Sequence, residues 1–81
     1  GYGGIREVEF FINTLQLIYG IEEKALRTHR LSKAINVLRK MGIVPEEELY
    51  SLWQNYLFLR KIENYLQMKD DIQTHTLPKD E

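Results

Sequence analysis

Apolar residues recur at every third or fourth position over residues 5–19, 31–41 and 45–70, with polar residues between them. This spacing places apolar side chains on one face of a helix, so it predicts three amphipathic helices with about these bounds. Gly20 and Gly42 each follow the last apolar position of a helix, where glycine commonly adopts a left-handed conformation. The sequence therefore predicts an all-α fold, a three-helix fragment of a helical bundle with a long third helix.

The third predicted helix has a strong start signal and two apolar faces. Pro45 suits the first helical position, and the acidic residues 46–48 then lie at the positive end of the helix dipole. No glycine or proline follows before Pro78, so the helix is expected to be about 39 Å long. One stripe comprises Leu49, Leu52, Tyr56, Leu59, Glu63 and Leu66, and the other Trp53, Leu57, Phe58, Ile62 and Tyr65. Two faces need two neighbours, which indicates that residues 1–81 form a single helical domain belonging to a larger helical assembly.

The connection between the first two helices is expected to contain a short helical turn within residues 22–26, and Thr28 is a candidate N-cap of the second helix. Residues 24–40 carry six basic side chains and no acidic one, which is typical either of a solvated helix face or of a contact with phosphate or an acidic partner. The basic residues are Lys24, Arg27, Arg30, Lys33, Arg39 and Lys40.

Composition narrows the functional classes. The chain has 81 residues, of which 43% are hydrophobic and 28% charged, so it is expected to fold rather than remain disordered. It has no cysteine, which excludes disulfides, thiolate zinc sites and cysteine nucleophiles. Its apolar runs are too short for a membrane span, so no membrane partner is expected. The basic segment lacks interleaved aromatic residues, so we expect no nucleic-acid partner.

A pair of glycines, Gly3 and Gly4, precedes the first helix. Glycines allow close backbone approach, and a helix N-terminus offers free amides, so this feature is either a phosphate contact or simply a turn. Arg6 adds a cationic donor in the first turn. Glu7 and Glu9 oppose anion binding unless a metal bridges them, and their alternative role is to pair with the helix dipole.

Two polar stripes interrupt the apolar pattern. Arg6, Glu9, Asn13 and Gln16 share one face of the first helix, and Arg60, Glu63, Gln67 and Asp70 share one face of the third. A carboxylate within an apolar seam needs a partner. We hypothesise that the stripes face each other and that Glu9 and Glu63 pair with Arg60 and Arg6; the alternative is simple exposure to solvent.

A group of hydrogen-bonding residues, Gln73, Thr74 and His75, follows the third helix and is expected to form a loop. These side chains either cap a neighbouring helix or contribute to a site. A lone histidine is a poor metal ligand set, and His29 is remote in sequence, so no metal site is predicted in this chain. No arrangement with a convincing nucleophile is present, so no catalytic residue is assigned.

Three segments together resemble a known family. Residues 3–10 read Gly-Gly-Ile-Arg-Glu-Val-Glu-Phe, residues 56–63 read Tyr-Leu-Phe-Leu-Arg-Lys-Ile-Glu, and residues 71–78 read Asp-Ile-Gln-Thr-His-Thr-Leu-Pro. The chain resembles the helical segment that follows a nucleotidyltransferase core in bacterial glutamine synthetase adenylyltransferases, which add and remove adenylyl groups. In that family the core carries Gly-Ser followed by an Asp-x-Asp pair that binds two divalent metals. This chain has no Asp-x-Asp, so the resemblance implies a piece of a multidomain enzyme, inactive by itself.

The resemblance also implies roles for residues and partners. Glutamate at position 7 matches the adenylyl-removing half, in which phosphate attacks the adenylyl-tyrosine bond and releases ADP. Gly3, Gly4, Arg6, Glu7 and Glu9 are implied to form a wall near the nucleotide or phosphate, and Gln73, Thr74 and His75 match the closing motif. The parent enzyme is expected to use Mg²⁺ and ATP or ADP in the cytoplasm, whereas the isolated fragment is expected to hold no cofactor. Its implied partners are glutamine synthetase and a PII-type signalling protein.

Two alternatives stand beside this interpretation. The related uridylyltransferase of the nitrogen-signalling protein has a comparable core and helical segment, although the motif of residues 3–10 matches the adenylyltransferase better. A free-standing helical module that binds a partner helix through an exposed apolar face is a different class of function.

Overall fold

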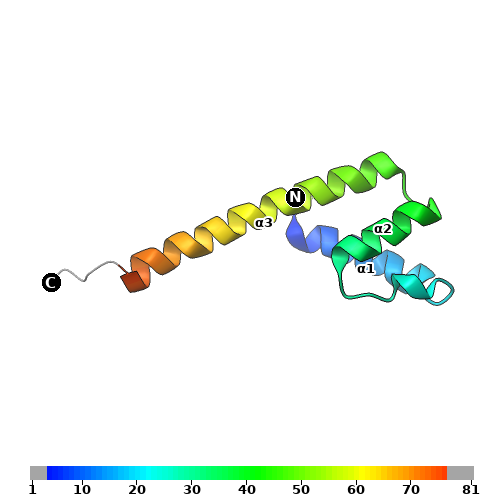
Figure 1. Ribbon diagram of the computed structural model, residues 1–81, viewed down its shortest axis with the longest axis horizontal. Coiled ribbons are helices and arrows are strands. Elements are labelled where there is room, and N and C mark those ends of the chain that lie inside the picture. The colour runs from blue at the N-terminus through cyan, green and yellow to red at the C-terminus, as the bar shows by residue number, and fades with distance from the viewer. Residues whose placement is uncertain (1–3, 77–81) are drawn as a thin grey trace.

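The computed structural model describes residues 4–76, and the side chains of residues 4–74. Helix α1 spans Ile5–Tyr19, α2 spans Leu31–Met41 and α3 spans Glu46–Asp71. A 3₁₀ turn, Lys24–Leu26, lies between α1 and α2, and a π-helical turn, Ile72–Thr76, continues α3. The described residues contain no strand. The predicted all-α fold with a long third helix is confirmed (Figure 1).

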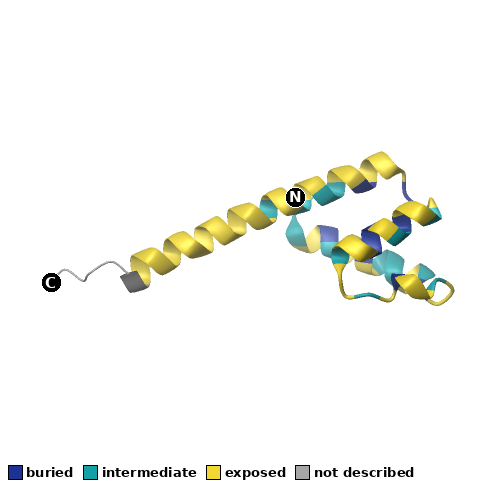
Figure 2. Ribbon diagram, viewed as in Figure 1, coloured by how far each residue is buried: buried dark blue, intermediate teal, exposed yellow. Residues whose placement is uncertain are grey.

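The core lies where the three helices meet. Ile12 of α1, Leu38 of α2 and Leu49 of α3 are almost completely buried, and Leu26 of the 3₁₀ turn joins them. These residues pack in one cluster with Ala34, Ile35 and Val44. The apolar spacing of each helix therefore produces a single small core, at the end of the molecule where α3 begins (Figure 2).

Beyond this core, α3 projects away from the other helices. The molecule measures 62 × 23 × 18 Å, and its radius of gyration is 17.3 Å, against about 12 Å for a compact chain of this length. The first stripe of α3 is buried or half-buried from Leu49 to Leu59, but every residue from Arg60 to Thr74 is exposed. Both α1 and α2 thus cover the first half of α3 and leave its second half bare (Figures 1 and 2).

The helix ends differ from the prediction at several residues. Gly42 has φ 73°, as expected, and its amide donates to the carbonyls of Leu38 and Arg39. The expectation for Gly20 is wrong, because this residue is right-handed with φ −71°. The reason is Arg27, whose Nε donates to the Gly20 carbonyl at 2.7 Å and whose Nη2 donates to the Ile21 carbonyl at 2.9 Å. A side chain, rather than a left-handed turn, satisfies these carbonyl groups.

The starts of α2 and α3 also need small corrections. Arg30, not Thr28, is the N-cap of α2, although the Thr28 hydroxyl accepts a hydrogen bond from the Arg30 amide at 3.1 Å. Pro45 is the N-cap of α3 and Glu46 its first helical residue. Both shifts arise because a cap residue is extended, and periodicity does not distinguish an extended flanking residue from the first helical one.

Candidate functional site

The start of α1 is organised by its own carboxylate. Gly4 is the extended N-cap, and Glu7 Oε1 accepts a hydrogen bond from the Gly4 amide at 3.4 Å. This contact is the carboxylate half of a capping box, and it places a negative charge at the positive end of the helix dipole. Glu7 therefore occupies the Gly4 amide, one of the donors that a bound anion would use. The amides at the start of α1 are for this reason a weaker phosphate site than the pair of glycines predicts.

A hollow of about 480 Å³ separates the start of α1 from the middle of α3. It brings together three of the predicted site residues, Gly4, Arg6 and Glu7, with Glu63 of the predicted polar network. Gly3 lies outside the described residues. The α3 side is otherwise apolar and is formed by Leu59, Ile62 and Leu66. Arg6, Glu7 and Glu63 are all exposed, so the hollow offers one guanidinium and two carboxylates above an apolar wall.

The predicted ion-pair network is wrong. Within residues 4–74, the ion pair present is Arg39–Glu46, and none joins Glu9 or Glu63 to Arg6 or Arg60. Instead the Tyr56 hydroxyl donates to Glu9 Oε2 over a long 3.5 Å, and the Arg60 guanidinium lies 5.9 Å from the Tyr56 ring centroid. The physical reason is exposure: water competes for charges that lie in an open hollow, and holding two long side chains together costs entropy.

Tyr56 is a site residue that the sequence pattern did not reveal. It belongs to the apolar stripe of α3, so the pattern assigned it only to packing. Its ring stacks on Trp53 at a centroid distance of 5.5 Å, and its hydroxyl reaches Glu9. Tyrosine combines an apolar ring with a hydroxyl group that forms hydrogen bonds. A tyrosine within an apolar stripe is therefore the sequence signal for a hydrogen bond to a polar stripe on the neighbouring helix.

A second, polar hollow of about 350 Å³ follows Glu9 along α1 and is lined also by Asn13, Gln16, Thr28 and His29. Gln16 is half-buried, and its Nε2 donates to the carbonyls of Leu26 at 2.6 Å and Thr28 at 2.9 Å. Gln16 therefore ties the connection between α1 and α2 to α1. Asn13 is exposed and makes no side-chain hydrogen bond within the described part of the chain.

The closing motif does not join these residues. The expected loop is wrong, because residues 72–76 form a π-helical turn that extends α3. Gln73 and Thr74 are exposed, as is Gln67 one turn earlier; the side chain of His75 lies outside the described residues. Figure 1 places this turn at the far tip of α3, away from the start of α1. The last part of α3, beyond Leu66, thus lies between the two end signatures of the sequence.

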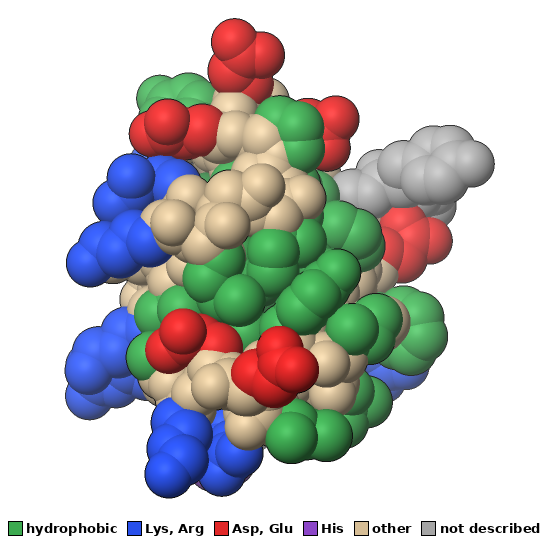
Figure 3. Space-filling model, turned by 90° about the vertical axis from the view of Figure 1, so that its right-hand side faces the viewer, with side chains coloured by type: hydrophobic (Ala, Val, Ile, Leu, Met, Phe, Trp, Pro, Cys, Tyr) green, Lys and Arg blue, Asp and Glu red, His purple; other side chains and the backbone are tan. Residues whose placement is uncertain are grey.

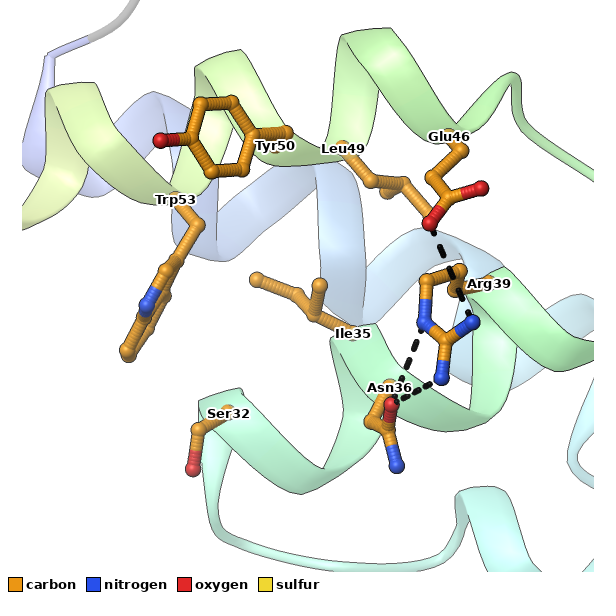
Figure 4. A pocket seen from close by; sticks show the side chains of 8 residues that line it. All are labelled: Ser32, Ile35, Asn36, Arg39, Glu46, Leu49, Tyr50 and Trp53. Atoms are coloured by element: carbon orange, nitrogen blue, oxygen red, sulfur yellow. Dashed lines mark hydrogen bonds and ion pairs between the residues drawn. The ribbon is translucent and has the colours of Figure 1, made fainter.

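The basic segment has a structural function in part. All six basic side chains are exposed, and basic groups gather along one side of the molecule in Figure 3. Arg27 holds the end of α1, as described above. Arg39 donates to Asn36 Oδ1 from Nε and Nη2, and its Nη1 lies 3.9 Å from Glu46 Oε2, which links α2 to α3 beside a hollow of about 220 Å³ (Figure 4). The other four cations make no ion pair among the described residues.

The described residues were also considered as a metal site and as a membrane span. Among the side chains of residues 4–74, no three of the histidine, aspartate and glutamate groups lie close enough to hold a metal ion. None of the helices in the described part of the chain is both long enough and apolar enough to cross a membrane.

Comparison with known proteins decides the family. The sequence model of the GlnD PII-uridylyltransferase family matches residues 1–81. The chain belongs to this family.

The chain is also similar to proteins that are named bifunctional glutamine synthetase adenylyltransferase/adenylyl-removing enzyme. The protein of Stenotrophomonas maltophilia K279a is 51% identical over 99% of this chain, and that of Mannheimia succiniciproducens is 44% identical over 100%. The protein of Xanthomonas campestris pv. campestris B100 is 47% identical over 100%. The resemblance inferred from the motifs is thereby confirmed. The chain spans about 9% of the length of the first relative, and no solved structure matches it.

Proposed function

We propose that this chain is the helical segment of a glutamine synthetase adenylyltransferase/adenylyl-removing enzyme, which controls glutamine synthetase by adding AMP and by removing it with phosphate. The observation that carries the proposal is the 44–51% identity with enzymes of that name over essentially the whole chain. The segment itself is a scaffold for the parent enzyme and one wall of its cleft.

The cleft wall is the hollow at the start of α1. Arg6 is exposed there, and its guanidinium makes no ion pair within the described residues, so it is available for a phosphate or nucleotide. Glu7 supports the wall by capping the helix through the Gly4 amide. The proposed contribution of this segment is to position the nucleotide or phosphate through Arg6, which lines the hollow together with the carboxylates of Glu7 and Glu63.

Mg²⁺ and ATP or ADP belong in this proposal to the parent enzyme. We assign the metal ligands to other parts of the parent polypeptide, because the Asp-x-Asp pair that binds metal in the resembled family does not occur in residues 1–81. A metal bound there supplies charge stabilisation at phosphorus. The family resemblance further supports our proposal that the enzyme acts in the cytoplasm on glutamine synthetase, with a PII-type signalling protein as the regulatory partner.

The cleft-wall role is tested by Arg6→Gln in the parent polypeptide. Loss of a charge-assisted hydrogen bond of about 1.5–3 kcal/mol is expected to lower kcat/KM for phosphorolytic removal of AMP by roughly tenfold to a hundredfold. Arg30→Gln is the matched control, because Arg30 is exposed and lies outside the hollow. Equal activity of the two variants would refute the cleft wall and leave the segment as a scaffold.

The enzyme assignment has a separate test in the gene. The codons that precede residue 1 are expected to encode Gly-Ser followed by Asp-x-Asp, because metal-assisted nucleotidyl transfer requires such carboxylates. A start codon directly before residue 1 would contradict the assignment and favour an interaction module.

A further inference from the structure

The hollow beside Arg39 lies between α2 and α3 and measures about 220 Å³. Its floor is apolar, because Ile35 of α2 and Leu49 of α3 line it and are buried. Figure 4 shows the rings of Tyr50 and Trp53 at one end of the hollow and Arg39 at the other. Tyr50 is 65% exposed, so a bound group can reach the aromatic end from solvent.

The size of this hollow suits one side chain of a protein better than a small molecule. Pockets for small molecules usually measure about 300–1,000 Å³, which is more than this hollow offers. Protein interfaces, in contrast, are held mainly by a few large side chains that fill well-packed pockets. The apolar floor and the two aromatic rings form a pocket of that kind, so the hollow suits a large apolar anchor residue of a partner.

The α2 side of the hollow is polar at its rim and basic beyond it. Ser32, Asn36 and Arg39 line the hollow from α2. With about 3.6 residues per turn, Lys33 and Lys40 lie on the next strip of the helix surface, beside Asn36. Both lysines are exposed, and neither makes an ion pair among the described residues. A partner seated in the hollow therefore meets unpaired cations next to it.

The carboxylates near the hollow do not neutralise these cations. Helix α2 contains no acidic residue. Glu46 of α3 lines the hollow, but its Oε2 lies 3.9 Å from Nη1 of Arg39, at the end away from the aromatic rings. Glu47 and Glu48 follow Glu46 in the first turn of α3 and do not line the hollow, because successive residues face different sides of a helix. The charge of this surface thus favours an acidic partner.

We propose that the hollow and the basic strip of α2 bind an acidic segment of a partner protein. The segment inserts one large apolar side chain against Ile35 and Trp53 and places carboxylates near Lys33 and Lys40. Charge complementarity is the reason for this occupant, because opposite charges around a buried anchor steer and orient a partner. A basic or uncharged segment would leave both lysines unpaired.

This surface is separate from the hollow at the start of α1. The α3 residues that line the two hollows lie within residues 46–53 and 59–66, so their centres are about 20 Å apart along the helix axis. The two hollows share no lining residue. Binding of an acidic segment between α2 and α3 therefore does not depend on the proposed phosphate or nucleotide site.

The test is ligand-observed NMR, in which short peptides are titrated into the intact parent polypeptide and saturation transfer to the peptide is measured. The peptide Asp-Glu-Phe-Glu-Asp is expected to bind with a Kd below about 1 mM at low salt and more weakly as salt rises, because salt screens exposed charges. Its phenylalanine ring protons are expected to receive the strongest transfer. Asp-Glu-Ser-Glu-Asp, which lacks the anchor, is expected to bind at least about tenfold more weakly.

Each contrary result overturns a stated part of the proposal. No binding of Asp-Glu-Phe-Glu-Asp would overturn the surface as a whole. Equal binding of the two acidic peptides would overturn the anchor, and equal binding of Lys-Lys-Phe-Lys-Lys would overturn the acidic partner. Tighter binding of a single-stranded oligouridylate of the same charge would assign the surface to nucleic acid, and peptide binding that weakens as the protein is concentrated would assign it to a second copy.

Variants locate the contact on α2 and α3. Lys33→Glu is expected to weaken binding of Asp-Glu-Phe-Glu-Asp by about threefold to tenfold, because it replaces attraction with repulsion. Lys24→Glu is the matched control, because Lys24 is exposed in the same basic segment but belongs to the 3₁₀ turn. Equal weakening by these two variants would reveal only general attraction of an anion and would overturn the proposed surface.

The aromatic end has its own pair of variants. Tyr50→Ala is expected to weaken binding of Asp-Glu-Phe-Glu-Asp by about threefold to tenfold and to leave binding of Asp-Glu-Ser-Glu-Asp unchanged, because it removes one wall around the anchor. Tyr65→Ala is the matched control, because Tyr65 is 60% exposed on the same helix and does not line the hollow. Equal peptide binding by these two variants would overturn the position of the anchor.

Discussion

The contact most open to a quantitative test is the one that Gln16 makes with the connection between α1 and α2. Its Nε2 donates to the carbonyl oxygens of Leu26 and Thr28 over 2.6 and 2.9 Å, and the side chain is half-buried. Gln16→Ala removes both donors and leaves two partly buried carbonyl groups to find water. This change tests whether the polar stripe of α1 stabilises the fold.

The expected magnitude follows from the two hydrogen bonds. Each contributes about 0.5–1.5 kcal/mol net, so the variant is expected to lose roughly 1–3 kcal/mol of unfolding free energy. A loss of about 2 kcal/mol lowers the Tm of a domain of this size by roughly 8–16 °C. Gln16→Glu is expected to be more destabilising at neutral pH, because it replaces the donor with a carboxylate that faces the same two carbonyl oxygens.

The assay is thermal unfolding of the 81-residue chain, followed by far-ultraviolet circular dichroism. Asn13→Ala is the control, because Asn13 lies one turn earlier on the same stripe, is exposed and makes no side-chain hydrogen bond in the described part of the chain. It is expected to change the unfolding free energy by less than about 0.5 kcal/mol. Equal unfolding temperatures for Gln16→Ala and Asn13→Ala would show that Gln16 does not hold the connection between α1 and α2.

Further stability predictions concern the core and the two glycines, all read from the same unfolding assay. Leu38→Ala is expected to cost about 2–5 kcal/mol because Leu38 is fully buried, whereas Leu17→Ala at a 79% exposed position is expected to be nearly neutral; similar losses would place the core elsewhere. Gly42→Ala is expected to cost about 1–2 kcal/mol because φ is 73°, and no loss would mean that α2 ends differently. Gly20→Ala is expected to cost about 1–3 kcal/mol because the new Cβ would overlap the Gln16 carbonyl oxygen, and unchanged stability would contradict that close approach.

The helices were predictable because their signals are local. The apolar spacing of α1 and α2 matches their observed bounds, and the bounds of α3 differ from the prediction by one residue at each end. The conformation of Gly20 was not predictable in this way. It depends on Arg27, seven residues later, which turns back to hold the carbonyl groups at the end of α1. The spacing of apolar residues does not predict a hydrogen bond between a side chain and a backbone carbonyl group six or seven residues earlier.

The candidate site was predictable as a set of polar residues but not as a set of contacts. A helical wheel gives the face on which Glu9 or Glu63 lies, but it does not give the axial offset between two helices. In the structure this offset brings Glu9 to Tyr56 and leaves Glu63 beside the start of α1. A shift of one helical turn is about 5.4 Å, which is larger than the reach of an ion pair. Contacts between helices therefore required the tertiary structure.

The central proposal is that the chain is part of an enzyme that adds and removes AMP on glutamine synthetase, and the most direct test is the reaction itself. The parent polypeptide is incubated with adenylylated glutamine synthetase and inorganic phosphate, and released ADP is measured. The account predicts ADP release that requires phosphate and matches the adenylyl groups lost from glutamine synthetase. No ADP release, together with transfer of uridylyl groups from UTP to a PII-type protein, would contradict it.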